Sequence, residues 1–272
     1  MTGRPPVSPL ARYARQLVLP ELGPVGQERL RSARVLVVGC GGLGAPVIQQ
    51  LAAAGVGGMT LVDDDVVEVS NLNRQTLFGE ADVGDRKAVV AAGFVRRLDS
   101  DIDVQPLVER VTTARARRLV AAHDVTVDCS DGLPTKYLLN DAAVRERRPL
   151  IHGAATAWSG QVLVVRSPQG PCLRCLFPSL PPRGSLPTCR TAGILGAVTS
   201  VVGSFQAAEA VKVLVGDPRA LSGRFLAIDV LEPSTRVMTF PRDPACPACG
   251  DLPICDAEHD ADYDLPVCED ED

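Results

Sequence analysis

The feature that most constrains this chain is a short apolar run that ends in glycines, RVLVVGCGGLGAP at residues 34–46. Gly39, Gly41 and Gly44 have the G-x-G-x-x-G spacing, and Asp63 ends a second apolar run about 20 residues further on. Glycines let the backbone approach a phosphate, and the N-terminus of the next helix offers free N–H groups. The pattern predicts a strand–loop–helix–strand unit that binds a nucleotide, with Asp63 at the ribose; the alternative is a glycine-rich turn without a ligand.

Apolar runs and helical patterns alternate through the first half of the chain. Expected strands lie at 34–39, 59–63, 102–107, 125–130 and 149–154, with helices at 43–55, 85–98, 113–122 and 135–147 between them. Such alternation is typical of βαβ units. Later runs at 160–165, 224–229 and 235–240 lack crossover helices, and an apolar segment at 192–216 indicates a buried helix. We expect an α/β fold, a Rossmann-like mixed sheet with a parallel N-terminal half and antiparallel C-terminal strands.

Charged residues after the second strand help to separate two kinds of nucleotide. The segment SNLNRQ contains Asn71, Arg74 and Gln75, and Lys87 opens the next expected helix. A triphosphate under attack needs fixed cations where charge builds up, whereas backbone amides largely serve a dinucleotide. Asp131 follows a strand and could hold Mg²⁺ through oxygen. Each of these residues alone could be a solvated charge or a helix cap, but together they favour ATP.

The cysteines fall into three groups. Cys172-x-x-Cys175 and Cys246-x-x-Cys249 form two pairs whose thiolates suit one structural, tetrahedral zinc. Cys40 and Cys129, in apolar contexts, are expected to be small buried side chains. Cys189 closes a proline-rich loop beside a cation and a helix start, which would favour its thiolate. Cys255 and Cys268 lie in the last, acidic stretch and are read as incidental.

Charge and hydropathy exclude several classes of protein. The 23 residues from 250 onward carry ten acids and no Lys or Arg, so they are expected to form an acidic, disordered tail at 251–272. The remaining residues carry 28 basic and 23 acidic side chains. This positive charge is too small to indicate a protein that binds nucleic acid. No apolar run is expected to reach the roughly 20 residues of a membrane helix. With no signal-peptide pattern at the start, we expect a cytoplasmic protein.

Several segments together are similar to one family. RYARQ, the quoted glycine loop, SNLNRQ, DVGDRKA, DCSDG and the paired cysteines resemble, in that order, the bacterial ThiF/MoeB/HesA family, relatives of the ubiquitin-activating enzymes. The resemblance covers about residues 12–250. One departure is Gly132, where the family usually has Asn.

The resemblance implies an ATP-dependent adenylyltransferase. Its substrate would be the C-terminal Gly-Gly carboxylate of a ubiquitin-like sulfur carrier of the ThiS or MoaD type. The nucleotide would be bound, with Mg²⁺, by residues of the segments just described, namely Gly39, Gly41, Gly42, Gly44, Asp63, Asn71, Arg74, Lys87 and Asp131. Arg15 would reach into a partner subunit's site, which implies a homodimer.

The resemblance also divides the chain and suggests partners. It implies N-terminal helices at 8–31, a nucleotide-binding half at 32–155 and a zinc-containing half at 156–250. Cys189 would carry a persulfide-linked intermediate in ThiF-type members and is dispensable for adenylation in MoeB-type members. Sulfur is expected from a separate donor, a cysteine desulfurase or rhodanese. Thiamine, molybdopterin and related sulfur-transfer pathways all stay open.

Two alternatives of other classes remain. The same glycine fingerprint serves NAD-dependent oxidoreductases, although His123 and His152 lie in contexts with no evident acid–base role. A catalytically inactive scaffold member of the family is the other; the presence of Arg74, Lys87 and Asp131 argues against it.

Overall fold

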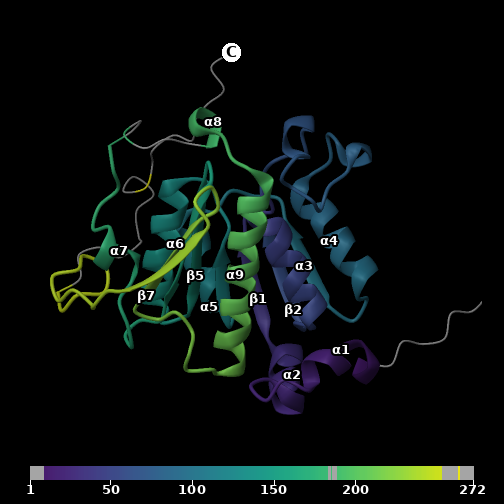
Figure 1. The fold of residues 1–272 in the computed structure, drawn as a ribbon, viewed down its shortest axis with the longest axis horizontal. Helices are drawn as coiled ribbons and strands as arrows, with labels where there is room; N and C mark the ends of the chain where they lie inside the picture. The colour runs from purple at the N-terminus through teal and green to yellow at the C-terminus, as the bar shows by residue number, and fades with distance from the viewer. Residues whose placement is uncertain (1–8, 183–184, 186–188, 253–262, 264–272) are drawn as a thin grey trace, which may run out of the picture.

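Eight strands form one mixed sheet with helices on both faces in the computed structural model, which describes residues 9–182, 185, 189–252 and 263 (Figure 1). The strands are β1 (Arg34–Val38), β2 (Gly58–Val62), β3 (Asp103–Leu107), β4 (Val125–Asp128), β5 (Leu150–Thr156), β6 (Ser159–Val165), β7 (Arg224–Asp229) and β8 (Ser234–Thr239). Their spatial order is β3-β2-β1-β4-β5-β6-β7-β8. The strands from β3 to β5 are parallel and those from β5 to β8 antiparallel, which confirms the predicted mixed sheet.

The helices follow the predicted alternation closely. They are α1 (Pro9–Leu17), α2 (Gly23–Ser32), α3 (Gly44–Ala54), η1 (Val69–Asn71), η2 (Glu80–Asp82), α4 (Lys87–Leu98), α5 (Thr113–Ala121), α6 (Leu133–Arg145), α7 (Leu173–Leu176), α8 (Cys189–Ala192) and α9 (Gly196–Val215). The expected helix at 192–216 is interrupted, because Gly193 adopts a left-handed φ of +74° between α8 and α9.

Strand register brings three loops to one edge of the sheet. Val38 at the end of β1 lies opposite Val62 of β2 and Asp128 of β4. These strands are parallel, so the glycine loop, Asp63 and the residues after Asp128 all leave the sheet at the same edge. Ligands of open α/β sheets bind at this carboxyl edge.

Two hydrophobic clusters lie on opposite faces of the sheet. One includes Val35, Val37, Ile48 and Ala91 with the buried face of α9, and the other includes Leu36, Leu139 and Leu150. Alternate residues of β1 therefore feed the two cores, as a strand buried on both faces requires. Figure 1 shows α9 running across the sheet beside α3.

Helix α9 corrects one expectation from the sequence. By length and composition alone it could cross a membrane, although no run of that length was expected. Half of its apolar window is buried within the protein, where it packs on the sheet. The apolar composition of α9 is thus that of a helix packed in the core of the protein.

Helix α1 lies at the end of the molecule away from the glycine loop. The Tyr13 side chain occupies the space beside Gly55, which caps the C-terminus of α3, and donates a hydrogen bond to Asp99 at the C-terminus of α4 (2.9 Å). Because the glycine loop precedes the opposite end of α3, α1 is remote from it (Figure 1).

Candidate functional site

The glycine loop is shaped by close backbone contacts. Gly39 has a left-handed φ of +93°, and a Cβ there would lie 2.6 Å from the Cys129 carbonyl oxygen. A Cβ on Gly44 would lie 2.1 Å from the Gly39 carbonyl oxygen. Larger residues cannot occupy either position without displacing backbone.

The loop presents backbone donors that lack acceptors. Helix α3 has no side-chain cap, since Leu43 stands at its N-cap position. Within the described residues, no acceptor takes the N–H groups of Gly41, Gly42 or Leu43. Unpaired N–H groups at the positive end of a helix form an anion-binding site.

Asp63 connects the end of β2 to this loop. Its Oδ2 accepts a hydrogen bond from the Cys40 N–H (2.7 Å), and its Oδ1 accepts one from the Asp65 N–H (2.9 Å). Burial raises the pKa of the Asp63 carboxyl, while these two bonds and Lys87 act in the opposite direction. The sequence predicted that Asp63 binds the ribose of a nucleotide. The structure adds that Asp63 holds the glycine loop through its hydrogen bond from Cys40.

The SNLNRQ segment forms a tight turn after β2. The carbonyl oxygen of Asn71 accepts hydrogen bonds from the N–H groups of Arg74 and Gln75 (3.0 and 2.9 Å). The Asn71 side chain is buried and bonds within the turn, to the Glu68 N–H and to Ser70. Arg74 is half-buried, and its Nη1 donates to the Ser70 carbonyl and to Asn73. The turn therefore fixes the backbone position from which the Arg74 side chain extends.

Lys87 lies at the start of α4 with its side chain buried. Its Nζ lies 2.7 Å from Asp65 Oδ2, and Asp65 is itself largely exposed. The charge of Lys87 also acts to lower the pKa values of Asp63 and Cys40, which places it near the loop. One oxygen each of Asp63, Asp64 and Asp65 could approach a metal, but Lys87 and Arg110 pair with two of the three.

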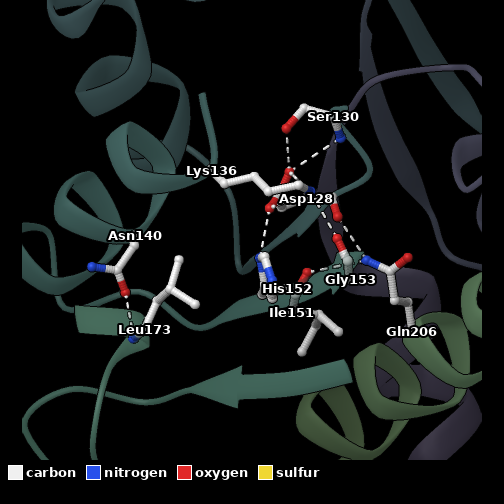
Figure 2. A network of polar contacts seen from close by, with 9 residues as sticks. All are labelled: Asp128, Ser130, Lys136, Asn140, Ile151, His152, Gly153, Leu173 and Gln206. Carbon is white, nitrogen blue, oxygen red and sulfur yellow. Dashed lines mark hydrogen bonds and ion pairs between the residues drawn. The ribbon is translucent and has the colours of Figure 1, made fainter. Parts of the chain in front are cut away.

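A buried polar network supports the loop after β4 (Figure 2). Asp128 is fully buried; its Oδ1 accepts hydrogen bonds from the Ser130 hydroxyl (2.6 Å) and N–H (3.1 Å). Its Oδ2 accepts one from His152 Nδ1 (2.9 Å), and Lys136 Nζ lies 3.3 Å away. Burial alone would raise the pKa of Asp128, but Lys136 and His152 outweigh it and lower the pKa to about 2.

The network leaves Asp131 free at the sheet edge. Asp131 is exposed and makes no hydrogen bond or ion pair to any described residue. Gly132, at the departure from the family pattern, occupies the N-cap position of α6 and supplies no side-chain cap. Ser130, held on Asp128, precedes Asp131 directly, so the network orders the loop that carries it.

Helix α9 contacts four parts of this edge in turn. A Cβ on Gly196 would lie 2.5 Å from the Asn73 carbonyl oxygen, and the Thr199 side chain meets Gly42. Gly203 lies against the Leu43 carbonyl and Pro46. Gln206 Nε2 donates to the Asp128 carbonyl oxygen (2.7 Å). One face of one helix thus contacts the turn, the glycine loop, α3 and β4.

The four predicted metal-binding cysteines meet in space. Their Sγ atoms all lie within 4.8 Å of one another, with Cys172–Cys246 at 3.6 Å and Cys175–Cys249 at 3.3 Å. Disulfide sulfurs would lie about 2.05 Å apart, whereas four sulfurs at about 2.3 Å from one zinc lie roughly 3.8 Å from each other. The cluster therefore fits a closed tetrahedral metal site. Cys40 and Cys129 are buried as predicted, and burial raises both thiol pKa values.

One predicted residue, Arg15, lies away from the glycine loop of its own chain, and another, Cys189, is not described in full. Arg15 is exposed on α1, at the far end from the glycine loop, and pairs with no described residue. Cys189 begins α8, and its side chain, like Cys255 and Cys268, lies outside what the structure describes.

The structure adds features that the sequence did not indicate. Tyr263, in the stretch expected to be a solvated tail, is buried, and its hydroxyl donates a hydrogen bond to Asp141. Asp141 also pairs with Arg174, which stands between the first two paired cysteines (2.7 Å). The sequence spacing of Lys136, His152 and Tyr263 does not indicate the contacts that these side chains make with Asp128 and Asp141, because each contact depends on tertiary packing.

Fold and site together define an α/β protein with a candidate nucleotide site, in which cations lie beside the glycine loop. The ThiF family model matches residues 13–248, and the chain belongs to that family.

Relatives of known name cover most of the chain. It is 49% identical over 249 residues to a sulfur carrier protein adenylyltransferase of Thermus thermophilus, covering 90% of this chain and 92% of the relative. It is 48% identical to a SAMP-activating enzyme E1 of Haloferax volcanii, with 93% of each covered. It is also 48% identical to adenylyltransferase and sulfurtransferase MOCS3 of Sus scrofa, but spans only 57% of that protein.

The fold is shared with solved structures. E. coli MccB crystallised with ATP superposes with a TM-score of 0.78 at 24% identity, over 88% of this chain and 74% of MccB. A second E. coli MccB structure, with MccA-N7isoASN, gives a TM-score of 0.80. At this identity the likeness concerns the fold.

Proposed function

We propose that this chain uses ATP to adenylate the C-terminal carboxylate of a ubiquitin-like sulfur carrier. The carrying observation is the set of unpaired N–H groups at Gly41, Gly42 and Leu43, at the start of α3 and beside two cations. Family membership and the names of the relatives support the choice of a carrier protein as substrate.

The reaction joins the carrier to AMP. A carboxylate oxygen of the carrier forms a bond to the α-phosphorus of ATP, and the bond to the bridging oxygen of the β-phosphate breaks. Pyrophosphate departs with that electron pair, which leaves an acyl-adenylate. The glycine-loop amides and the dipole of α3 hold phosphate, and Asp63 holds the ribose.

Arg74 and Lys87 compensate the charge that grows on the departing pyrophosphate. Their present partners are a backbone carbonyl, a neighbouring amide and the exposed Asp65, each of which water can replace. Both cations can therefore turn to phosphate at low cost. Such interactions act mostly on turnover, because they strengthen in the transition state.

Asp131 is the residue that would hold Mg²⁺. Its exposed carboxylate has no described partner, and Mg²⁺ commonly takes one or two carboxylates together with water and substrate phosphate. When bound, the metal neutralises phosphate charge. The chain's part is to keep Asp131 in place through Ser130 and Asp128.

Zinc at the four cysteines would be structural. The donor set is closed and tetrahedral, and the Asp243 N–H donates to Cys175 Sγ (3.5 Å), as outer hydrogen bonds in such sites do. It would join the segment after β6 to the segment after β8.

The remaining assignments follow from the family resemblance. Arg15 would serve the partner subunit of a homodimer, in keeping with its exposure far from its own glycine loop. Cys189 would carry the covalent sulfur intermediate, with sulfur from a separate desulfurase or rhodanese. The enzyme would work in the cytoplasm, for thiamine, molybdopterin or a related pathway.

Carrier-dependent exchange of labelled pyrophosphate into ATP tests the proposal. Purified protein should incorporate label only with a Gly-Gly-ended carrier, and candidate carriers compared side by side identify the substrate. Lys87→Ala should abolish exchange, while Arg97→Ala, an exposed cation at the other end of α4, should not. Binding of NADH without ATP would instead indicate an oxidoreductase, and ATP binding without exchange a scaffold.

A further inference from the structure

Gln75 is a buried residue whose side chain has no hydrogen-bond partner among the residues that the structure describes. Its residue exposure is 4%, and its backbone is fixed on both sides by bonds to Asn71 and Phe78. Its Oε1 is fully buried and accepts no hydrogen bond, and its Nε2 donates none to the described residues. A buried amide oxygen without a donor lowers the stability of the protein that contains it.

The carboxamide faces the glycine loop. Gln75 Nε2 lies 3.4 Å from the position that a Cβ on Gly41 would occupy. The N–H groups of Gly41 and Gly42 have no acceptor there either. Three neighbouring donors without acceptors indicate a place where a ligand supplies the acceptors.

Three other buried polar atoms lack partners, and they differ from Gln75. His152 and Gln206 each use another side-chain nitrogen in the network of Figure 2. Thr126 lies within β4, fully buried between β1 and β5. Among these four residues, Gln75 alone pairs an unpartnered side chain with the loop that presents free amides.

We infer that Gln75 is a nucleotide-binding residue whose Nε2 donates a hydrogen bond to a phosphate oxygen at the glycine loop. This inference rests on the proposed use of ATP. It assigns to the last residue of the SNLNRQ segment a direct contact with the nucleotide.

A pair of isosteric substitutions tests it. Gln75→Met removes the buried, unpartnered Oε1, so the melting temperature of the nucleotide-free protein should rise by about 3 °C. The same change should weaken MgATP binding by calorimetry about 10-fold or more, because a hydrogen bond to a charged group is lost. Thr126→Val, the matched control, should also raise the melting temperature but leave MgATP affinity unchanged.

The inference is tested by two changes in opposite directions, a higher melting temperature without nucleotide and a lower affinity for MgATP. Equal MgATP affinity in Gln75→Met and the unaltered protein would overturn the inference, as would a lower melting temperature without nucleotide. Gln75→Glu, which keeps the shape but places a carboxylate beside phosphate, should weaken binding at least as much and serves if the Met variant does not fold. Failure of the unaltered protein to bind MgATP would instead overturn the proposed function, and this inference with it.

Discussion

Replacing Lys136 by Met should be among the most destabilising single changes in the part of the chain described. Lys136 is 4% exposed, and its Nζ donates to the Gly153 carbonyl oxygen (2.7 Å) and lies beside the fully buried Asp128. The substitution preserves volume but leaves Asp128 as a buried carboxylate without its cation. Breaking a buried ion pair in this way costs about 3–5 kcal/mol, which corresponds to a fall of roughly 10 °C in melting temperature for a domain of this size.

His152 makes the cost depend on pH. Its Nδ1 bonds Asp128, so in the variant a protonated His152 can replace the lost charge. The loss of stability should therefore be smaller at pH 6 than at pH 8, as measured by urea unfolding at both values.

A double-mutant cycle with Asp128→Asn isolates the pair. The double variant should be less destabilised than the two single changes together, because neither buried charge remains. The control is Arg148→Met, which breaks an exposed pair with Asp124 and should change stability by under about 1 kcal/mol. A Lys136→Met cost no larger than that of the control, or strict additivity in the cycle, would refute this account of the network.

Three further predictions concern acid, metal and subunits. Stability should fall in two steps on acidification. The first step lies below pH 6.5, because burial lowers the pKa of folded His152 and unfolding therefore takes up a proton. The second lies between pH 3.8 and about pH 2, where Asp128 loses about 2 kcal/mol of stabilisation; urea midpoints across pH would show a flat profile if the network were absent. Cys246→Ser with Cys249→Ser should lower zinc content and melting temperature together, since metal binding contributes folding free energy; elemental analysis that finds zinc retained would contradict the site. Mixing Arg15→Ala with Arg74→Ala chains should restore about a quarter of the exchange activity if subunits redistribute and each heterodimer holds one intact site; verified heterodimers without activity would exclude a shared site.

The sequence predicts what depends on local pattern. Strand–helix alternation predicted the mixed sheet, and the two C-x-x-C pairs predicted the cluster of Cys172, Cys175, Cys246 and Cys249. It could not predict that Asp128 faces His152, because that contact depends on the register between β4 and β5. The missing partners of Gln75 are likewise invisible in sequence, since an unmet hydrogen bond is a property of three-dimensional surroundings. The helix expected at 192–216 is longer than α9, because the left-handed backbone of Gly193 breaks it and the sequence pattern does not show that conformation.

The contacts along α9 have a mechanical consequence. Gly196, Thr199, Gly203 and Gln206 lie on one helix, and each closely contacts a different segment of the candidate nucleotide site. Sliding the helix by the rise of a single residue, about 1.5 Å, would break all four contacts at once. A displacement that begins at α8, where Cys189 starts, would therefore act on every segment simultaneously.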